Sequence, residues 1–298
     1  MLRTCGSLLE CSLVNGGVKC WGHNAYGQLG NNTVTSSPSP VPVVGLERDV
    51  EAIAVGELHS CALVHGGVQC WGYNVDGELG NGTTTQSLVP AAVGLLTSGI
   101  QTLAAGNFHN CSSVDGGIRC WGLNDSGQLG NNTLVSSSLP VQVTNLLTGV
   151  QQVTGGTAHS CAMVNGAAQC WGYNGVGTLG DGTSIDSQVP VAVSSLSAGV
   201  QAVVAGSAHT CALVNGGVQC WGRNGYGQLG NTVIDQSHVP VPVINLTSGA
   251  QSLALGYGHS CAVVNGSAQC WGSNLHGELG NQSTEPSMVP VTVGPWAP

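Results

Sequence analysis

The sequence predicts an all-β protein, a β-propeller of six four-stranded antiparallel blades. The chain repeats itself every 50 residues, each repeat reads as several short strands, and no segment has helical periodicity. Blades of four strands need a period of about 40 to 50 residues, which favours a propeller over an open solenoid. The period is marked by Trp21, Trp71, Trp121, Trp171, Trp221 and Trp271, and by Pro40, Pro90, Pro140, Pro190, Pro240 and Pro290.

The second repeat shows the expected strands in order. Val50–Val55 reads as a first strand and His59–Val64 as a second, with a glycine-containing connection between them. A third strand follows directly after a two-residue turn. A long loop rich in Gly, Asn and Thr then leads to a fourth strand near Val89–Val93, and its proline suits an edge strand.

The turn between the second and third strands is the strongest local signal. Asn-Gly or Asp-Gly occupies it in five repeats and His65-Gly66 in the second, and such pairs tolerate the positive φ angles of a type I′ hairpin. Counting outward from the turn places Cys61 opposite Cys70 at a non-hydrogen-bonded pair, where Cα atoms lie about 4.5 Å apart. A disulfide can span that distance.

The same register predicts six disulfides and an oxidising compartment, hence an extracellular or cell-surface protein. Buried free thiols are a weaker interpretation because both cysteines recur in every repeat, and zinc ligands would need a second pair nearby. Cys5 is left over; it aligns with Val55 and reads as a core residue, with an intermolecular disulfide as the alternative. The predicted pairs are Cys11 with Cys20, Cys61 with Cys70, Cys111 with Cys120, Cys161 with Cys170, Cys211 with Cys220 and Cys261 with Cys270.

The register of the repeats never slips, so we expect one propeller domain over residues 1–298. A first strand at Met1–Cys5 and a fourth strand at Val289–Val293 would allow the terminal strands to close the ring by pairing. A seven-bladed or open ring remains an alternative. The repeats are 1–50, 51–100, 101–150, 151–200, 201–250 and 251–298.

Composition excludes several functions. The formal net charge is -9, with five Lys and Arg against fourteen Asp and Glu, so the chain lacks the cations that neutralise nucleic-acid phosphates. No apolar run reaches the roughly 18 residues of a membrane helix, and Met1–Glu10 does not read as a signal peptide. We therefore expect no nucleic-acid partner and no membrane insertion.

No cofactor, metal site or catalytic residue is predicted. Histidines recur two residues before the first cysteine in five repeats. A ring of histidines suggests a metal site or a pH switch. Equivalent positions in different blades stand too far apart to share an ion, so we expect each imidazole to form a structural hydrogen bond with a loop carbonyl instead. A few acids, namely Asp76, Glu78, Asp125 and Glu278, read as a solvated edge, or as an acidic rim. The histidines are His59, His109, His159, His209 and His259.

Glycosylation sequons exceed chance about twofold, and four of the eight share one position in the repeat, which would place glycans on one face. Trp296 lies outside the repeat and could dock on the first blade or on a neighbouring molecule, so we count it with Cys5 as a possible interaction residue. The four shared sequon residues are Asn31, Asn81, Asn131 and Asn281.

The repeat Trp-Gly-x-Asn-x-x-Gly-x-Leu-Gly, preceded by Gly-x-x-His-x-Cys, resembles the RCC1-type repeat of the regulator of chromosome condensation family. The match covers nearly the whole chain. The paired cysteines make it similar to an extracellular, disulfide-containing variant of bacterial type, and they argue against carrying over nucleotide exchange or chromatin binding. The resemblance implies a propeller used as a binding surface.

We therefore expect a secreted or cell-surface, non-catalytic binding scaffold whose specificity for a protein or glycan ligand lies in its variable loops. A structural subunit of an extracellular fibre or coat that self-assembles is the first alternative. An enzyme acting on polysaccharide is the second, and the least supported.

Overall fold

The computed structural model describes the backbone of residues 2–5 and all of residues 8–294. This part of the chain is all-β, with four antiparallel strands from each repeat forming one sheet, as predicted. The strands of the first three blades are β1 (Leu2–Cys5), β2 (Leu9–Val14), β3 (Gly17–Gly22), β4 (Ser37–Pro42), β5 (Val50–Val55), β6 (His59–Val64), β7 (Gly67–Gly72), β8 (Ser87–Ala92), β9 (Ile100–Ala105), β10 (His109–Val114), β11 (Gly117–Gly122) and β12 (Ser137–Gln142).

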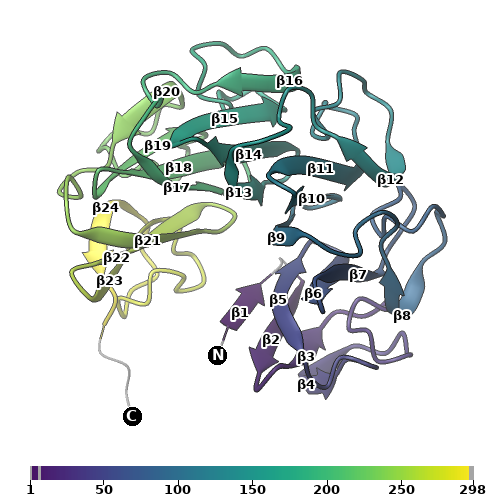
Figure 1. Cartoon of the computed structure of the whole chain (residues 1–298). Coiled ribbons are helices and arrows are strands. Elements are labelled where there is room, and N and C mark those ends of the chain that lie inside the picture. The colour runs from purple at the N-terminus through teal and green to yellow at the C-terminus, as the bar shows by residue number, and fades with distance from the viewer. Residues whose placement is uncertain (1, 6–7, 295–298) are drawn as a thin grey trace.

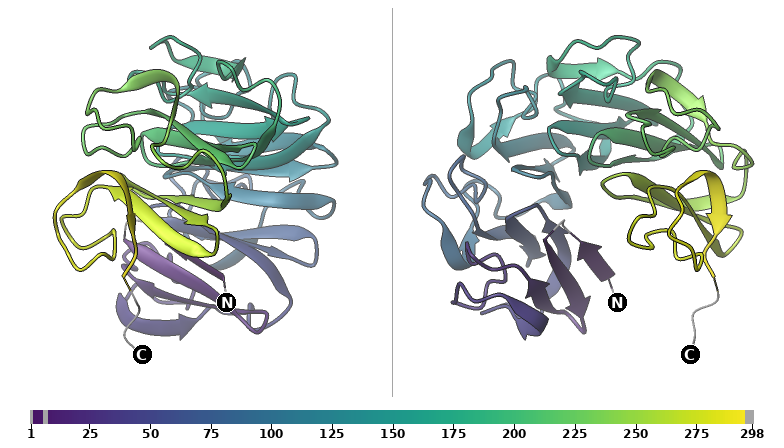
Figure 2. Two further views of the ribbon diagram at one scale, coloured as in Figure 1. Left: turned by 90° about the vertical axis from the view of Figure 1, so that its left-hand side faces the viewer. Right: turned by 180° about the vertical axis from the view of Figure 1, so that it is seen from behind.

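The last three blades repeat the pattern, and the blades succeed one another around a common axis (Figures 1 and 2). Their strands are β13 (Val150–Gly155), β14 (His159–Val164), β15 (Ala167–Gly172), β16 (Ser187–Ala192), β17 (Val200–Ala205), β18 (His209–Val214), β19 (Gly217–Gly222), β20 (Ser237–Pro242), β21 (Ala250–Leu255), β22 (His259–Val264), β23 (Ser267–Gly272) and β24 (Ser287–Thr292). First strands of neighbouring blades lie against each other at the axis, and fourth strands form the rim.

The hairpin turns form as the sequence predicts. His65 has φ 51° and Gly66 φ 73°, and Asn215 and Gly216 have φ 51° and 80°. The register follows, with Val64 opposite Gly67 and Cys61 opposite Cys70. The fourth strand begins earlier than predicted, at Ser87 instead of Val89, because Ser87 pairs with Gly72 across a register shift.

The hydrophobic core lies between blades. Trp71 of the second blade is fully buried against Leu29 and Val43 of the first. Its indole Nε1 donates a hydrogen bond to the Gln28 carbonyl at 2.9 Å. Gly30 has φ 68°, and a Cβ there would lie 2.7 Å from that indole nitrogen, so only glycine allows this approach. Each blade therefore needs its neighbour to bury its tryptophan.

The predicted closure by pairing of the terminal strands is wrong. Within residues 2–5 and 8–294, β1 pairs with β2 and β24 pairs with β23, and no sheet joins the first blade to the sixth. The ring is open between these blades (Figures 1 and 2). The physical reason is that each repeat supplies all four strands of its own blade, so no blade lacks a strand that the other terminus could provide. Trp21 of the first blade is correspondingly less buried than Trp71.

Candidate functional site

The recurring histidines join neighbouring blades. His109 Nε2 lies 2.8 Å from Ser160 Oγ of the next blade, and Ser160 Oγ donates to the Gln128 carbonyl at 2.9 Å. Since the serine's one proton goes to that carbonyl, the histidine must donate from Nε2. His159 bonds Thr210 in the same way. The predicted structural role is confirmed, but the partner is a side chain of the next blade and not a loop carbonyl.

Burial keeps these histidines neutral. It lowers the pKa of His59 and His159 to about 4, and that of His109 and His209 to about 3. The Nδ1 atom of His109 is buried and has no hydrogen-bond partner. Protonation there would place an unsolvated charge between blades. Across the described residues, no group of His, Cys, Asp and Glu could hold a metal ion.

All six predicted disulfides are present. Their Cα atoms lie 4.0 to 4.1 Å apart, which is closer than the separation of about 4.5 Å expected from the register. Most of these cysteines are fully buried, so the bridges fasten the hairpins and offer no reactive thiol at the surface. The bridges join Cys11 to Cys20, Cys61 to Cys70, Cys111 to Cys120, Cys161 to Cys170, Cys211 to Cys220 and Cys261 to Cys270.

The two residues proposed for an interaction from the sequence are only partly covered by the structure. Cys5 ends β1, where its backbone pairs with Glu10, but its side chain lies outside the described residues. Trp296 also lies outside them. Roles for Cys5 and Trp296 in an interaction therefore stay predictions.

The shared sequon position has a structural use. Asn81 Oδ1 accepts hydrogen bonds from the amide and hydroxyl of Thr83, at 3.0 and 2.8 Å. Asp181 does the same for Thr183 in the fourth repeat, where no sequon exists. These hydrogen bonds to the threonine two residues later explain why an Asn or Asp oxygen recurs at this position of the repeat. Glycosylation of Asn31, Asn81, Asn131 and Asn281, which are partly exposed, stays a prediction.

One face of the propeller carries the long loops. In the second blade these are residues 56–58, between the first and second strands, and residues 73–86, between the third and fourth. We call this side, with the equivalent loops of the other blades, the loop face, and the opposite side the hairpin face. Buried Asn74 braces the long loop, since its Oδ1 accepts from the Leu79 amide and its Nδ2 donates to the Thr83 and Thr85 carbonyls.

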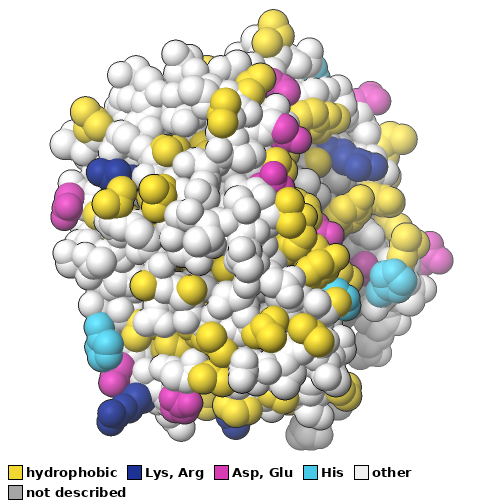
Figure 3. All heavy atoms as spheres, turned by 90° about the vertical axis from the view of Figure 1, so that its right-hand side faces the viewer, with side chains coloured by type: hydrophobic (Ala, Val, Ile, Leu, Met, Phe, Trp, Pro, Cys, Tyr) yellow, Lys and Arg dark blue, Asp and Glu magenta, His cyan; other side chains and the backbone are white. Residues whose placement is uncertain are grey.

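Acidic and apolar side chains concentrate in the loop-face segments. Arg223 is the one Lys or Arg in these loops, and Figure 3 shows acidic side chains among exposed hydrophobic ones along one side of the molecule. The acids are Glu57, Asp76, Glu78, Asp125, Asp181, Asp186, Asp235, Glu278 and Glu285. The exposed large hydrophobic residues within these loops are Leu8, Val34, Val75, Leu134, Val135, Tyr173, Ile185, Val233, Ile234, Tyr257 and Leu275.

Glu78 departs from the predicted solvated edge. Asp125 is exposed and Asp76 and Glu278 are partly exposed, but Glu78 is 0% exposed. Its Oε2 accepts from the Asp76 amide at 3.0 Å, whereas its Oε1 is buried without a hydrogen-bond partner. Burial raises the pKa of Glu78 to about 7. Sequence alone could not separate this acid from its exposed neighbours, because only the packed loop buries it.

Replacing this acid tests its burial. Glu78→Gln installs the residue that the first, third and fifth repeats carry here. A carboxyl whose pKa is raised by folding destabilises the protein progressively as pH rises from its unfolded pKa to its folded pKa. At pH 8.5 the variant, which lacks this carboxyl, should therefore be more stable than the parent protein. The expected gain is on the order of 3 kcal/mol, vanishing near pH 4. Guanidinium unfolding at both pH values measures it. An equal gain for exposed Asp125→Asn would contradict the argument.

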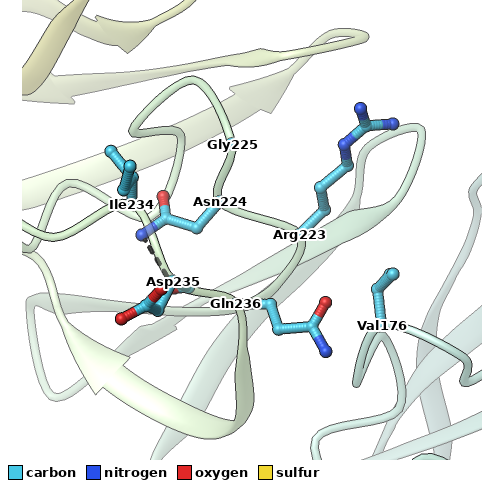
Figure 4. A pocket seen from close by; sticks show the side chains of 7 residues that line it. All are labelled: Val176, Arg223, Asn224, Gly225, Ile234, Asp235 and Gln236. Carbon is cyan, nitrogen blue, oxygen red and sulfur yellow. Dashed lines mark hydrogen bonds between the residues drawn. The ribbon is translucent and has the colours of Figure 1, made fainter.

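A shallow hollow of about 370 Å³ lies between the loops of the fourth and fifth blades (Figure 4). Arg223 and Val176 line it on one side and Ile234 on another. The Asn224 Nδ2 donates to the Asp235 carbonyl at 3.2 Å, which holds the loop around it. Its lining places no general base beside a nucleophile.

Three aromatic residues that the sequence analysis did not single out meet on the loop face. Tyr26 and Tyr73 pack edge to face with ring centroids 5.1 Å apart, and Tyr73 and Phe108 follow at 5.9 Å. We call these three residues the aromatic ladder. Burial, followed by the charges of Glu78 and Asp76, raises the pKa of Tyr73. These three positions vary from repeat to repeat, and that variability is the sequence signal that could have revealed the ladder.

The profile of the RCC1-like domain family matches residues 4–297. Human WBSCR16 is similar in structure, with 25% identity over 89% of this chain and 71% of that one, and a TM-score of 0.78. Yeast RCC1 (Prp20), solved with Kap60 bound, is 21% identical over 99% of this chain and 74% of that one, with a TM-score of 0.85. The CRINKLY WD40 ectodomain of the Arabidopsis thaliana receptor kinase ACR4 is 20% identical over 98% of this chain and 81% of that one, with a TM-score of 0.55.

Comparison with curated protein sequences gave no match. No helix in the described part of the chain is long and apolar enough to cross a membrane.

Proposed function

Because the chain belongs to the RCC1-like domain family, we propose that it is a non-catalytic binding scaffold which holds a protein partner on its loop face, outside the cell. The observation that carries the proposal is the unequal distribution of side chains. Exposed apolar residues and acids gather in the loops, whereas the recurring tryptophans and histidines bond neighbouring blades and the disulfides lie within blades. A rigid scaffold with variable loops is a common arrangement for recognition.

Two further facts support the proposal. The yeast relative was solved with a protein, Kap60, bound to it, and another similar structure is the ectodomain of a receptor kinase. Six disulfides persist best in an oxidising compartment, which favours the extracellular setting.

Site-specific photo-cross-linking tests the proposal. A photoreactive phenylalanine derivative is placed at Tyr173 or Tyr257 on the loop face, which are 37% and 65% exposed, in cells that produce the protein. Matched controls are placed at Leu95 or Leu147 on the hairpin face, which are 67% and 62% exposed. We expect a cross-linked protein partner from the loop-face positions only.

Other outcomes of the same experiment contradict the proposal. Equal cross-linking from both faces would remove the loop face as the binding site. A cross-linked second copy of this chain would favour the self-assembling subunit. The absence of any cross-linked protein would favour a glycan ligand, or no ligand at this face.

A further inference from the structure

The aromatic ladder is not a product of the repeat. Tyr26 stands where the third blade has Ser126, Tyr73 where it has Leu123, and Phe108 where the fourth blade has Ala158. The fold therefore tolerates small or aliphatic residues at all three positions. Yet the three rings come from three successive blades and converge into one edge-to-face row. All three are partly exposed, so the row has a surface that a ligand can reach.

Three acids lie in the second blade's loops, next to this row in the chain, and those loops contain no lysine or arginine. Asp76 and Glu78 belong to the same loop as Tyr73, and the Asp76 amide donates to Glu78 Oε2 at 3.0 Å. Glu57 Oε2 accepts from Asn107 Nδ2 at 2.6 Å, and Asn107 precedes Phe108 in the chain. The loops that the first three blades contribute to this face contain no Lys or Arg in their sequences. His23 is the other titratable ring here; its centroid lies 6.3 Å from that of Tyr26.

Glu78 adds an observation independent of the surface charges. In the first blade, Gln28 Oε1 accepts from the Tyr26 amide at 3.0 Å, and its Nε2 bonds His23 Nδ1 at 2.8 Å. Residue 23 is the equivalent of residue 73. Glu78 Oε2 matches Gln28 Oε1, so the partnerless Glu78 Oε1 takes the place of the amide nitrogen that faces residue 23, and it lies by this equivalence on the Tyr73 side. A buried oxygen without a donor is costly, and a cation bound above it would offset that cost.

We propose that the aromatic ladder, with Glu57, Asp76 and Glu78, is the seat for a lysine or arginine side chain of a basic protein segment. This inference rests on the proposed function and names the chemistry of the partner. The ring faces attract a cation through their quadrupoles, and the carboxylates supply the counter-charge. A neutral sugar could also stack on tyrosines, but it would leave the carboxylates without a counter-ion.

Fluorescence anisotropy with labelled hexa-arginine and hexa-lysine peptides tests the seat. A hexa-glutamine peptide is the neutral control. The variants Tyr73→Leu and Phe108→Ala keep every charge of the protein and install residues that other blades carry. We expect the double variant to weaken binding of the basic peptides at least tenfold at 150 mM salt. The matched variant Tyr173→Leu, in the fourth blade, should bind as the parent protein does.

Glu78→Gln and Asp76→Ser complete the set, again with residues that other blades carry. Each should weaken binding several-fold, and thermal unfolding should confirm that the variants stay folded. Equal binding by the parent and the double variant would mean that only the overall negative charge attracts the peptides, and it would overturn the seat. Equal binding of the neutral peptide, or of oligosaccharides in its place, would also overturn it.

The two proposals fail in different ways. If no peptide binds but loop-face cross-links to a protein persist, the cationic seat is wrong and the binding scaffold stands. If peptides bind at the ladder but cross-linking finds no protein partner, the seat exists without the proposed function.

Discussion

Lowering the pH from 7 to 5 is expected to destabilise the protein by several kcal/mol. Four buried histidines have their pKa lowered to about 3 or 4, against about 6.5 in the unfolded chain. A group with a depressed folded pKa contributes stability above its unfolded pKa and loses it as pH falls towards the folded value. At pH 5 each histidine therefore costs about 2 kcal/mol. Glu78, whose shift has the opposite sign, returns part of this loss.

Unfolding free energies measured by guanidinium titration between pH 5 and 8 check this expectation. His159→Leu provides the control, since Leu9 occupies the equivalent position in the first blade, where it is 2% exposed. The variant should lose about a quarter of the histidine-dependent pH slope. A slope that is flat in the parent protein, or that is unchanged in the variant, would show that these histidines do not stay neutral between the blades.

Removal of the disulfides is expected to have the second large effect. Each bridge closes a loop with a sequence separation of 9, for which the chain-entropy model gives about 2 to 3 kcal/mol, reduced where the hairpin already forms in the unfolded chain. The double variant Cys161→Ala, Cys170→Ala should lower the melting temperature measurably. Full reduction of all six should unfold the protein at or below about 40 °C.

Alkylation followed by mass spectrometry measures the starting state. Without reductant the protein should take up one label at most, at Cys5, because the other twelve cysteines are paired. Reduction should be slow in the native protein and fast in guanidinium, since most of these cysteines are buried. Uptake of several labels without reductant would contradict both the bridges and the extracellular setting.

Departures from the repeat locate the candidate site. Residues that recur in nearly every blade, such as Trp71 and His109, form hydrogen bonds to the neighbouring blade and have a structural role. Tyr26, Tyr73 and Phe108 stand at positions that vary between repeats, and no other run of neighbouring blades carries this combination of rings. Glu78 stands where three other repeats have glutamine. In a protein built from copies of one unit, a binding site requires such exceptions.

The sequence by itself determined the features that arise within one repeat. The Asn-Gly turn sets the register of the hairpin, and the register brings Cys211 opposite Cys220, because all the residues involved lie within about ten positions of one another. The number of blades and their antiparallel order follow from the same local signals and the period. These interactions are local, so their pattern is visible along the chain.

Only the tertiary structure decided what happens between repeats. His109 meets Ser160 across 51 positions, and the aromatic ladder joins three blades. The open ring, the burial of Glu78 and its partnerless oxygen likewise depend on how one blade packs on the next. The sequence shows that such residues recur, but it does not show which residue of the next repeat each one contacts. These contacts are set by the packing angle and loop conformations of the assembled propeller, and the candidate site is made of them.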